Sequence, residues 1–181
     1  MAGKDGRRAG NTVIEFTFVG IPLIFVLIST FELARGMWLY HTLAYAMREG
    51  VRFAIVHGNN CNIYPSNCVV TIRDISAKIR DGAVGLLPTD LQNVVFTSPG
   101  KVVVCPTLDD CLKPGAAGDT YWPANPPGGG SAPGADRVSR IEISSTFAFR
   151  SAISMFWPGA GRGVDFQTFW LPASSKERIQ Y

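Results

Sequence analysis

A run of sixteen residues near the amino terminus, Phe16–Phe31, contains no charged side chain. If residues 13–31 are helical, they cover about 28 Å at about 1.5 Å per residue, close to the roughly 30 Å hydrocarbon core of a bilayer. Pro22 lies inside this stretch, and membrane helices tolerate a proline when the freed carbonyl is satisfied locally. We therefore predict a single transmembrane helix over residues 11–31, with a modest kink at Pro22.

The rest of the composition limits what else this chain can be. Hydrophobic residues make up 46% of the 181 residues and charged residues only 17%, which excludes a chain disordered throughout. No second stretch is apolar for long enough to cross a membrane, which excludes a multi-spanning transporter. The net charge of +3 is small and scattered, so we expect no nucleic-acid partner.

The residues before the apolar stretch are basic. Lys4, Arg7 and Arg8 are opposed only by Asp5, so the positive-inside rule predicts a cytoplasmic amino terminus and an exported remainder. The alternative is a cleaved secretory signal peptide, for which Ala44–Ala46 offers an A-x-A pattern. We disfavour it because a signal sequence has an apolar region of about 7–15 residues, and this run is longer.

An apolar seam at heptad spacing continues the helix beyond the membrane, so we predict one helix over roughly 13–57, with residues 32–58 as an amphipathic extension. Gly58 begins the stop signal. The seam could cover the protein's own outer part or contact a partner helix, and the spacing alone favours the first interpretation. Its positions are Leu33, Met37, Tyr40, Ala44, Met47, Val51 and Ala54.

Residues 59–181 show shorter elements, typical of an α+β module. Ile72, Ile75 and Ile79 recur at helical spacing in a predicted amphipathic helix over 69–87. We expect this module to be a small antiparallel sheet packed against the long helix and the second helix. The predicted strands are 91–98 and 101–105, joined as a hairpin, then 139–150 and 164–171.

One segment of the outer module has a composition that cannot build a core. Between Lys113 and Asp136, six glycines and five prolines occupy eleven of twenty-four positions, so we predict a disordered loop over 113–136. Tyr121 and Trp122 within it could form a surface contact, although a loop aromatic is more often packed on its own domain.

The four cysteines fall into two local pairs, Cys61 with Cys68 and Cys105 with Cys111. An exported location favours disulfides, but four cysteines allow three connectivities, and a Cys68 to Cys105 bond is among them. A zinc site built from all four is the competing interpretation, and we disfavour it because the C-x2-C spacing of zinc ribbons is absent. We therefore expect no metal and no cofactor.

No motif for catalysis is present in the sequence. His41 and His57 lie sixteen residues apart on the long predicted helix, which is not a metal-ligand spacing, and neither has a recognisable nucleophile partner. The Gly128–Gly130 run lies among prolines rather than between a strand and a helix, so it is not a phosphate loop. We expect a protein that is not an enzyme.

Glu15 is the charged residue that a membrane helix would normally exclude. A carboxylate costs about 2.5–3.5 kcal/mol at the bilayer centre and less near the interface, and such residues are functional candidates that need a partner. A cut after Gly10 would create an α-ammonium at Asn11, four residues before Glu15 on the same helix. Proteolysis would thus create a partner for the carboxylate.

These residues carry a resemblance to a known family. The short basic leader ending in Gly10, followed by Asn11–Phe16 and an apolar helix, resembles the processing site of type IV pilin-like precursors. Together with 31–36 (FELARG) and 47–54 (MREGVRFA), it is similar to the TadE-like minor pseudopilins of the tight-adherence (Flp) pilus system. The resemblance is best over residues 7–57.

The resemblance implies specific roles and partners. Prepilin peptidase would cut after Gly10, releasing the leader 1–10, and Glu15 would neutralise an ammonium of its own or a neighbouring subunit. The partners would be other pilins or pseudopilins, the tight-adherence assembly machinery and membrane lipid. Asn11 differs from the phenylalanine that begins classical pilins, so N-methylation of that residue is not carried over.

We therefore expect a pilin-like minor pseudopilin or pilus assembly protein. It would cross the bacterial inner (cytoplasmic) membrane once, with a periplasmic or extracellular head at 59–181, and could be associated with the pilus. The alternative is an uncleaved, membrane-anchored binding module that recognises an extracytoplasmic ligand through Tyr121 and Trp122.

Overall fold

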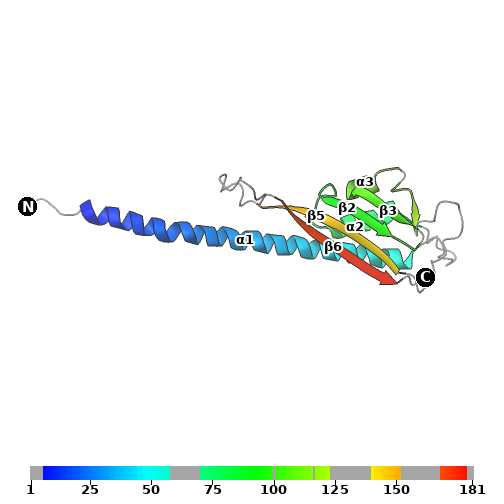
Figure 1. Ribbon diagram of the computed structural model, residues 1–181, viewed down its shortest axis with the longest axis horizontal. Coiled ribbons are helices and arrows are strands. Elements are labelled where there is room, and N and C mark those ends of the chain that lie inside the picture. The colour runs from blue at the N-terminus through cyan, green and yellow to red at the C-terminus, as the bar shows by residue number, and fades with distance from the viewer. Residues whose placement is uncertain are drawn as a thin grey trace, which may run out of the picture. The chain divides into compact units, whose positions relative to one another are not determined.

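The protein is α+β, as predicted, with a long amino-terminal helix, α1 (Gly6–Val56), and a small antiparallel sheet (Figure 1). In this computed structural model Trp38–Arg150 and Thr168–Tyr181 belong to one compact unit, called the head unit below, and α1 up to Met37 belongs to another. Only the backbone is described for residues 6–12. The described residues are 6–57, 70–99, 101–115, 117–122, 140–151 and 168–178.

The sheet of the head unit has four strands in the order β3-β2-β5-β6, and every neighbouring pair is antiparallel. Side chains alternate between buried and partly exposed along β5, so one face of the sheet is buried, as predicted. The strands are β2 (Leu91–Thr97), β3 (Val102–Thr107), β5 (Arg140–Arg150) and β6 (Thr168–Arg178).

Two strands extend past their predicted ends, and residues 164–167 of the last predicted strand lie outside the described residues. β6 runs to Arg178 rather than ending at 171, because it pairs with β5 over its full length and the pairing extends into a charged segment with no strand pattern. β3 continues through Pro106 to Thr107. Proline removes a donor from the ladder, which an edge strand such as β3 tolerates.

The second helix, α2 (Ile72–Gly82), begins at a capping box in which Thr71 and Asp74 satisfy each other's backbone donors. Ile72, Ile75 and Ile79 are fully buried, as the spacing predicts. The helix stops at Gly82, short of the predicted end at 87, and a turn with Gly85 at φ +83° follows. Glycine accommodates this backbone conformation at no steric cost.

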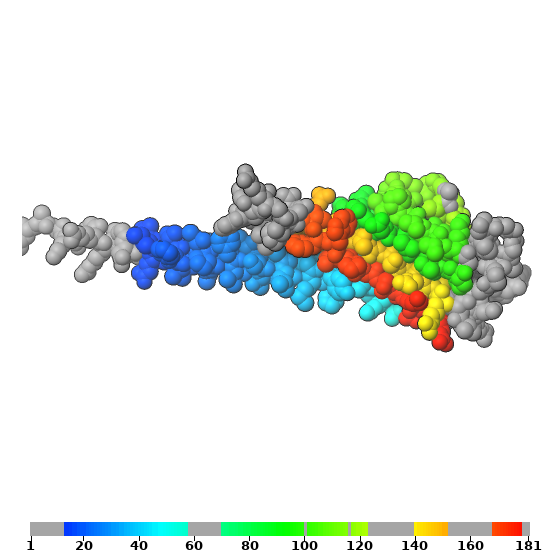
Figure 2. Space-filling model, viewed as in Figure 1, coloured from blue at the N-terminus to red at the C-terminus, as the bar shows by residue number. Residues whose placement is uncertain are grey.

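The buried face of the sheet packs on α1 and α2. A Cβ placed on Gly50 of α1 would meet both Ile79 of α2 and Ile143 of β5, so the three elements converge there. Figure 2 shows β5 and β6, in yellow to red, lying over the cyan end of α1. The core of the head unit is therefore shared between the last turns of α1, α2 and the sheet.

The buried stripe of α1 agrees with the predicted seam only in its last part. Met47, Val51 and Ala54 are fully buried, but Leu33, Met37 and Tyr40 are exposed and Ala44 is partly exposed. A straight helix of 3.6 residues per turn drifts from a 3.5-residue repeat, so the buried face moves to other residues. In the first turns of the head unit, Leu39 and Leu43 fill these positions.

Three short elements were not predicted: β1 (Val70–Thr71), α3 (Leu108–Leu112) and β4 (Tyr121–Trp122). β1 pairs with β4 in a separate two-stranded sheet. The prediction that 113–136 builds no core is wrong for Trp122, whose side chain is fully buried. Residues 123–136 of that predicted loop lie outside the described residues.

Candidate functional site

The three residues of the predicted processing site all lie on α1. Gly10 and Asn11 fall in the part described by its backbone, which is helical, and Glu15 has an exposed side chain. Asn11 and Glu15 are four residues apart, so they share one helix face and are separated by about 6 Å along the axis. The helical geometry that would bring a new amino terminus at Asn11 towards Glu15 is therefore present.

The carboxylate of Glu15 has no partner among the side chains that the structure describes. The neighbouring polar groups are satisfied within the helix: the Thr17 hydroxyl donates to the Val13 carbonyl and the Thr30 hydroxyl to the Val26 carbonyl, both at 2.8 Å. These two hydroxyls thus satisfy themselves locally, as a membrane helix would require. Glu15 differs from these threonines because its carboxylate can only accept hydrogen bonds, and the carbonyl groups of its own helix cannot donate one.

Most of the described side chains around Glu15 are apolar and exposed. Within the described residues, the segment from Val13 onward in α1 is the one helix long and apolar enough to span a membrane, with a mean hydropathy of 2.2 in its best window. None of that window is buried by the rest of the protein. The exposed large residues include Val13, Ile14, Phe16, Phe18, Val19, Ile21, Leu23, Ile24, Val26, Leu27 and Phe31.

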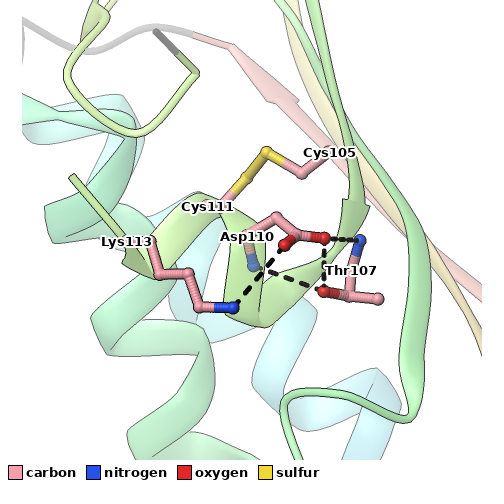
Figure 3. Close-up of a disulfide and its surroundings, with 5 residues drawn as sticks. All are labelled: Cys105, Thr107, Asp110, Cys111 and Lys113. Atoms are coloured by element: carbon pink, nitrogen blue, oxygen red, sulfur yellow. Dashed lines mark hydrogen bonds and ion pairs between the residues drawn. A yellow bond between two sulfur atoms is a disulfide. The ribbon is translucent and has the colours of Figure 1, made fainter. Parts of the chain in front are cut away.

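One of the predicted cysteine pairs forms a disulfide, between Cys105 in β3 and Cys111 in α3, with the Cα atoms 5.8 Å apart (Figure 3). This bond excludes the alternative pairing of Cys105 with Cys68. It also removes two of the four thiolates that the competing zinc site requires. Cys61 and Cys68 lie outside the described residues.

The disulfide is positioned by a capping box at the start of α3. The Thr107 hydroxyl and backbone N–H both donate to the Asp110 carboxylate, at 2.7 and 3.1 Å, and the Asp110 N–H donates back to the Thr107 hydroxyl (Figure 3). This box turns the chain sharply from β3 into α3. Cys111 is thereby brought back beside Cys105, and both are fully buried.

The same hydrogen bonds lower the pKa of Asp110 below its ordinary value of 3.8, because they favour the charged carboxylate. The Thr107 hydroxyl is the largest cause, and the positive charge of Lys113 adds to it. The pKa of Lys113 is raised, first by its hydrogen bond to Asp109, whose carboxylate lies 2.5 Å from the Lys113 Nζ. These charges stabilise the short helix that carries Cys111.

An open groove of about 620 Å³ lies between α1 and α2. Its charges pair with one another or with rings: Arg52 contacts Glu49 at 3.1 Å, and the Lys78 Nζ lies 5.6 Å from the centre of the Phe53 ring. Within the described ranges, no group of three His, Cys, Asp or Glu side chains could hold a metal ion. The lining residues are Tyr45, Glu49, Arg52, Phe53, Lys78, Asp81, Gly82 and Val84.

Sequence reasoning missed the structural role of two residues. Trp122 donates its indole N–H to the Ala54 carbonyl at 3.1 Å, and its ring packs edge-on against Phe96. Ala54 lies in the last turn of α1, where carbonyls have no intrahelical partner, so Trp122 caps that helix end. Gly50 allows α2 to approach α1 closely. The only indication of this packing role in the sequence was the position of Gly50 within the Met47–Ala54 motif.

Comparison with known families matches residues 10–52 to the family model described as TadE-like protein. No curated protein and no solved structure matches the chain. The resemblance predicted from the sequence is thus confirmed over residues 10–52, all of which lie in α1. The match links this helix to tight-adherence pilus systems.

Proposed function

We propose that the protein is a minor pseudopilin, or pilus assembly protein, of a tight-adherence (Flp) pilus system, and that it acts as a structural subunit rather than an enzyme. The observation that supports this proposal is that two features of α1 occur close together. The family match begins at Gly10, and Glu15 follows within an apolar helix surface, with an exposed carboxylate that has no partner among the described side chains. Pilin-like processing explains both features together.

Processing by prepilin peptidase after Gly10 would change the electrostatics of the helix start. The uncut helix has no acidic residue in its first turn and carries Arg7 and Arg8 near its amino end. The helix dipole favours anions there and disfavours cations. Removal of the leader places Glu15 close to the new start, where it compensates the Asn11 ammonium of its own chain or of a neighbouring subunit.

Membrane insertion with the amino terminus in the cytoplasm follows from the same segment. Lys4, Arg7 and Arg8 hold the leader on the cytoplasmic side, where the peptidase acts on pilin-like precursors. The head unit then lies on the periplasmic or extracellular side, where the Cys105–Cys111 disulfide is stable. The exposed apolar surface of α1 contacts lipid first and neighbouring pilin-like helices on assembly.

The alternative, an uncleaved binding module that uses Tyr121 and Trp122, is less well supported. The Trp122 side chain is fully buried and its N–H is already bonded to Ala54. Only Tyr121 of that pair is exposed. A single tyrosine leaves little of the recognition surface that this alternative needs.

Substitution at the proposed cleavage site distinguishes a processed pseudopilin from an uncleaved binding module. Gly10→Leu should leave the precursor uncut in cells that possess prepilin peptidase, while Gly6→Leu, a matched change within the leader, should be processed normally. Intact mass of the membrane-extracted chains gives the answer. Normal processing of Gly10→Leu, or an uncut wild-type chain, would contradict the proposed cleavage.

A further inference from the structure

The two ends of the sheet differ in chemistry. β2 begins at Leu91, opposite Phe147 of β5, and ends at Thr97, opposite Glu142. β6 carries Phe169 and Trp170 near its start, beside the Phe147 end, and finishes with charged residues beside the Glu142 end. One end of the sheet is therefore mainly aromatic and apolar, with Arg150 as the one charged strand residue there, and the other carries the charges of Glu142, Lys176, Glu177 and Arg178.

Two contacts show which residues of α1 lie beside each end of the sheet. Gly50 lies at the level of Ile143, since a Cβ there would stand 3.8 Å from the Ile143 Cδ1. Trp38 lies at the aromatic end, because its ring would be 2.9 Å from a Cβ on Gly85, in the turn that leads into Leu91. Trp38, the first residue of the head unit, thus lies at the aromatic end of the sheet.

Five large apolar side chains are exposed at this end, each by between 47% and 66% of its surface. Two of them, Val84 and Leu87, flank the Gly85 turn against which Trp38 packs. We call this surface the membrane rim. It consists of Trp38, Val84, Leu87, Phe169 and Trp170.

The distance along the chain places Trp38 close to the end of the uncharged run. Trp38 follows Phe31, the last residue of the uncharged run, by seven positions, or about 10 Å of helix. The headgroup layer adds about 5–8 Å to each side of the hydrocarbon core. A long side chain on a helix leans back towards the amino terminus, so the Trp38 ring lies nearer to the apolar run than its Cα and reaches this layer. Tryptophan is enriched in this layer because its ring is apolar while its N–H can reach water or headgroups.

We propose that the membrane rim rests in the headgroup layer, so that the head unit contacts lipid directly instead of standing free of the membrane. The inference rests on the membrane anchoring given under the proposed function. The occupant is the bilayer surface, because the rim is continuous along the chain with the apolar span. Lipid contact at Trp38 and Trp170 would set the height of the head unit before assembly.

Tryptophan quenching by lipid tests this contact in the full-length chain. In a Trp157→Phe background, which removes a tryptophan outside the described residues, the protein is reconstituted into phosphatidylcholine vesicles containing lipids brominated close to the glycerol. Replacing both Trp38 and Trp170 by Phe should reduce the quenched signal by about two-fold or more, since both rings lie in that layer. Trp122→Phe is the matched control, because its ring is buried in the core.

The outcomes separate the two proposals. Resistance to carbonate extraction together with unchanged quenching in the Trp38→Phe, Trp170→Phe variant would overturn the lipid contact and leave the anchor intact. A chain that carbonate extracts would overturn the anchor and the rim together. Loss of quenching in the inserted variant, with the signal retained in the Trp122 control, is the result we expect.

A charge-insertion pair gives an independent measurement. Val84→Asp with Leu87→Asp should lift the rim from the bilayer and lower Trp38 quenching, because carboxylates are unfavourable against lipid. Val102→Asp with Val104→Asp is the matched control: these valines are similarly exposed but lie on β3 towards the charged end of the sheet. Equal quenching in both pairs would contradict the proposal.

Discussion

Gly50 of α1 and Ile79 of α2 are packed so closely that no side chain fits between the two helices. A Cβ on Gly50 would stand 2.9 Å from the Ile79 Cδ1 and closer still to its Cγ1. Ile79 is fully buried, so it has no free space into which to move. The Met47–Ala54 motif thus contains a glycine that the head unit requires for packing.

Gly50→Ala should destabilise the head unit by about 1–3 kcal/mol, the usual cost of overpacking. Alanine gains at most about 1 kcal/mol of helix propensity over glycine, so the clash prevails. Urea unfolding of the detergent-solubilised chain measures the difference. Gly20→Ala is the control, since a Cβ there meets only Phe16, at an ordinary 3.6 Å. An equal or higher unfolding midpoint for Gly50→Ala would contradict this contact.

The cap that Trp122 places on α1 can be tested by Trp122→Phe, which removes the N–H together with part of the buried ring. Trp122→Phe leaves the Ala54 carbonyl without its donor, a loss of about 1–3 kcal/mol for a buried group. The neighbouring change Tyr121→Phe, at an exposed ring, should stay within about 0.5 kcal/mol. Chemical denaturation compares the two, and identical midpoints would show that the hydrogen bond contributes nothing.

The Cys105–Cys111 disulfide closes a short loop, so its contribution should be modest. Replacing both cysteines by alanine should lower the free energy of unfolding by about 2 kcal/mol on the loop-entropy model. Val104→Ala, at an exposed position on the same strand, serves as the control. A thermal midpoint unchanged by the double substitution would indicate that α3 and β3 are held together without the bond.

The capping box at Thr107 predicts an acid-dependent loss of stability. Because the pKa of Asp110 is lower in the folded chain than its ordinary value of 3.8, the unfolded chain binds the proton first as the pH falls. The stabilisation is therefore complete above pH 3.8 and is lost as the pH falls through the folded pKa. Thermal midpoints measured on both sides of this range should show the loss in the wild type.

Thr107→Val is the matched variant, because it removes the hydroxyl that is the main cause of the lowered pKa. Its midpoint should fall less steeply with acid than that of the wild type, and Asp110→Asn should behave similarly. If all three chains share one acid dependence, the capping box does not contribute to the pH response.

The sequence was sufficient to predict the long helix, the four-stranded antiparallel sheet and the location of α2, because periodic apolar residues determine these elements. The sequence was insufficient where a tertiary contact determines the length of a strand or the burial of a side chain. β6 reaches Arg178 only because β5 pairs with it, and Trp122 is buried only because Ala54 and Phe96 lie beside it. A loop rich in glycine and proline gives no local signal for such a contact.

In the candidate site, too, some features could be predicted from the sequence and others required the structure. Glu15 was identifiable because a carboxylate within an apolar run is costly. The pairing of Cys105 with Cys111 had to come from the structure, since the spacing allowed three connectivities. Residues of the predicted pair Cys61 and Cys68 lie outside the described ranges, so that pairing stays a prediction.

The proposed role of Glu15 predicts a separation between insertion and assembly. Glu15→Ala should insert at least as well as the wild type, because it removes a charge from the apolar helix. It should nevertheless fail in pilus assembly, since loss of one partner from a buried ion pair costs about 3–5 kcal/mol. Pili are counted by electron microscopy and insertion by carbonate extraction.

Two control variants accompany Glu15→Ala in the assembly assay. Glu15→Asp keeps the charge and should retain part of the assembly, and Thr17→Ala removes a hydroxyl that bonds only to its own helix. Normal piliation with Glu15→Ala would mean that the carboxylate has no role in subunit packing.

Amino-terminal sequencing of the wild-type chain, extracted from membranes of cells that possess prepilin peptidase, tests the central proposal most directly. The account predicts a mature chain that begins at Asn11 and retains Glu15 as its fifth residue. A chain that still begins at Met1 would contradict processing as a pilin-like precursor.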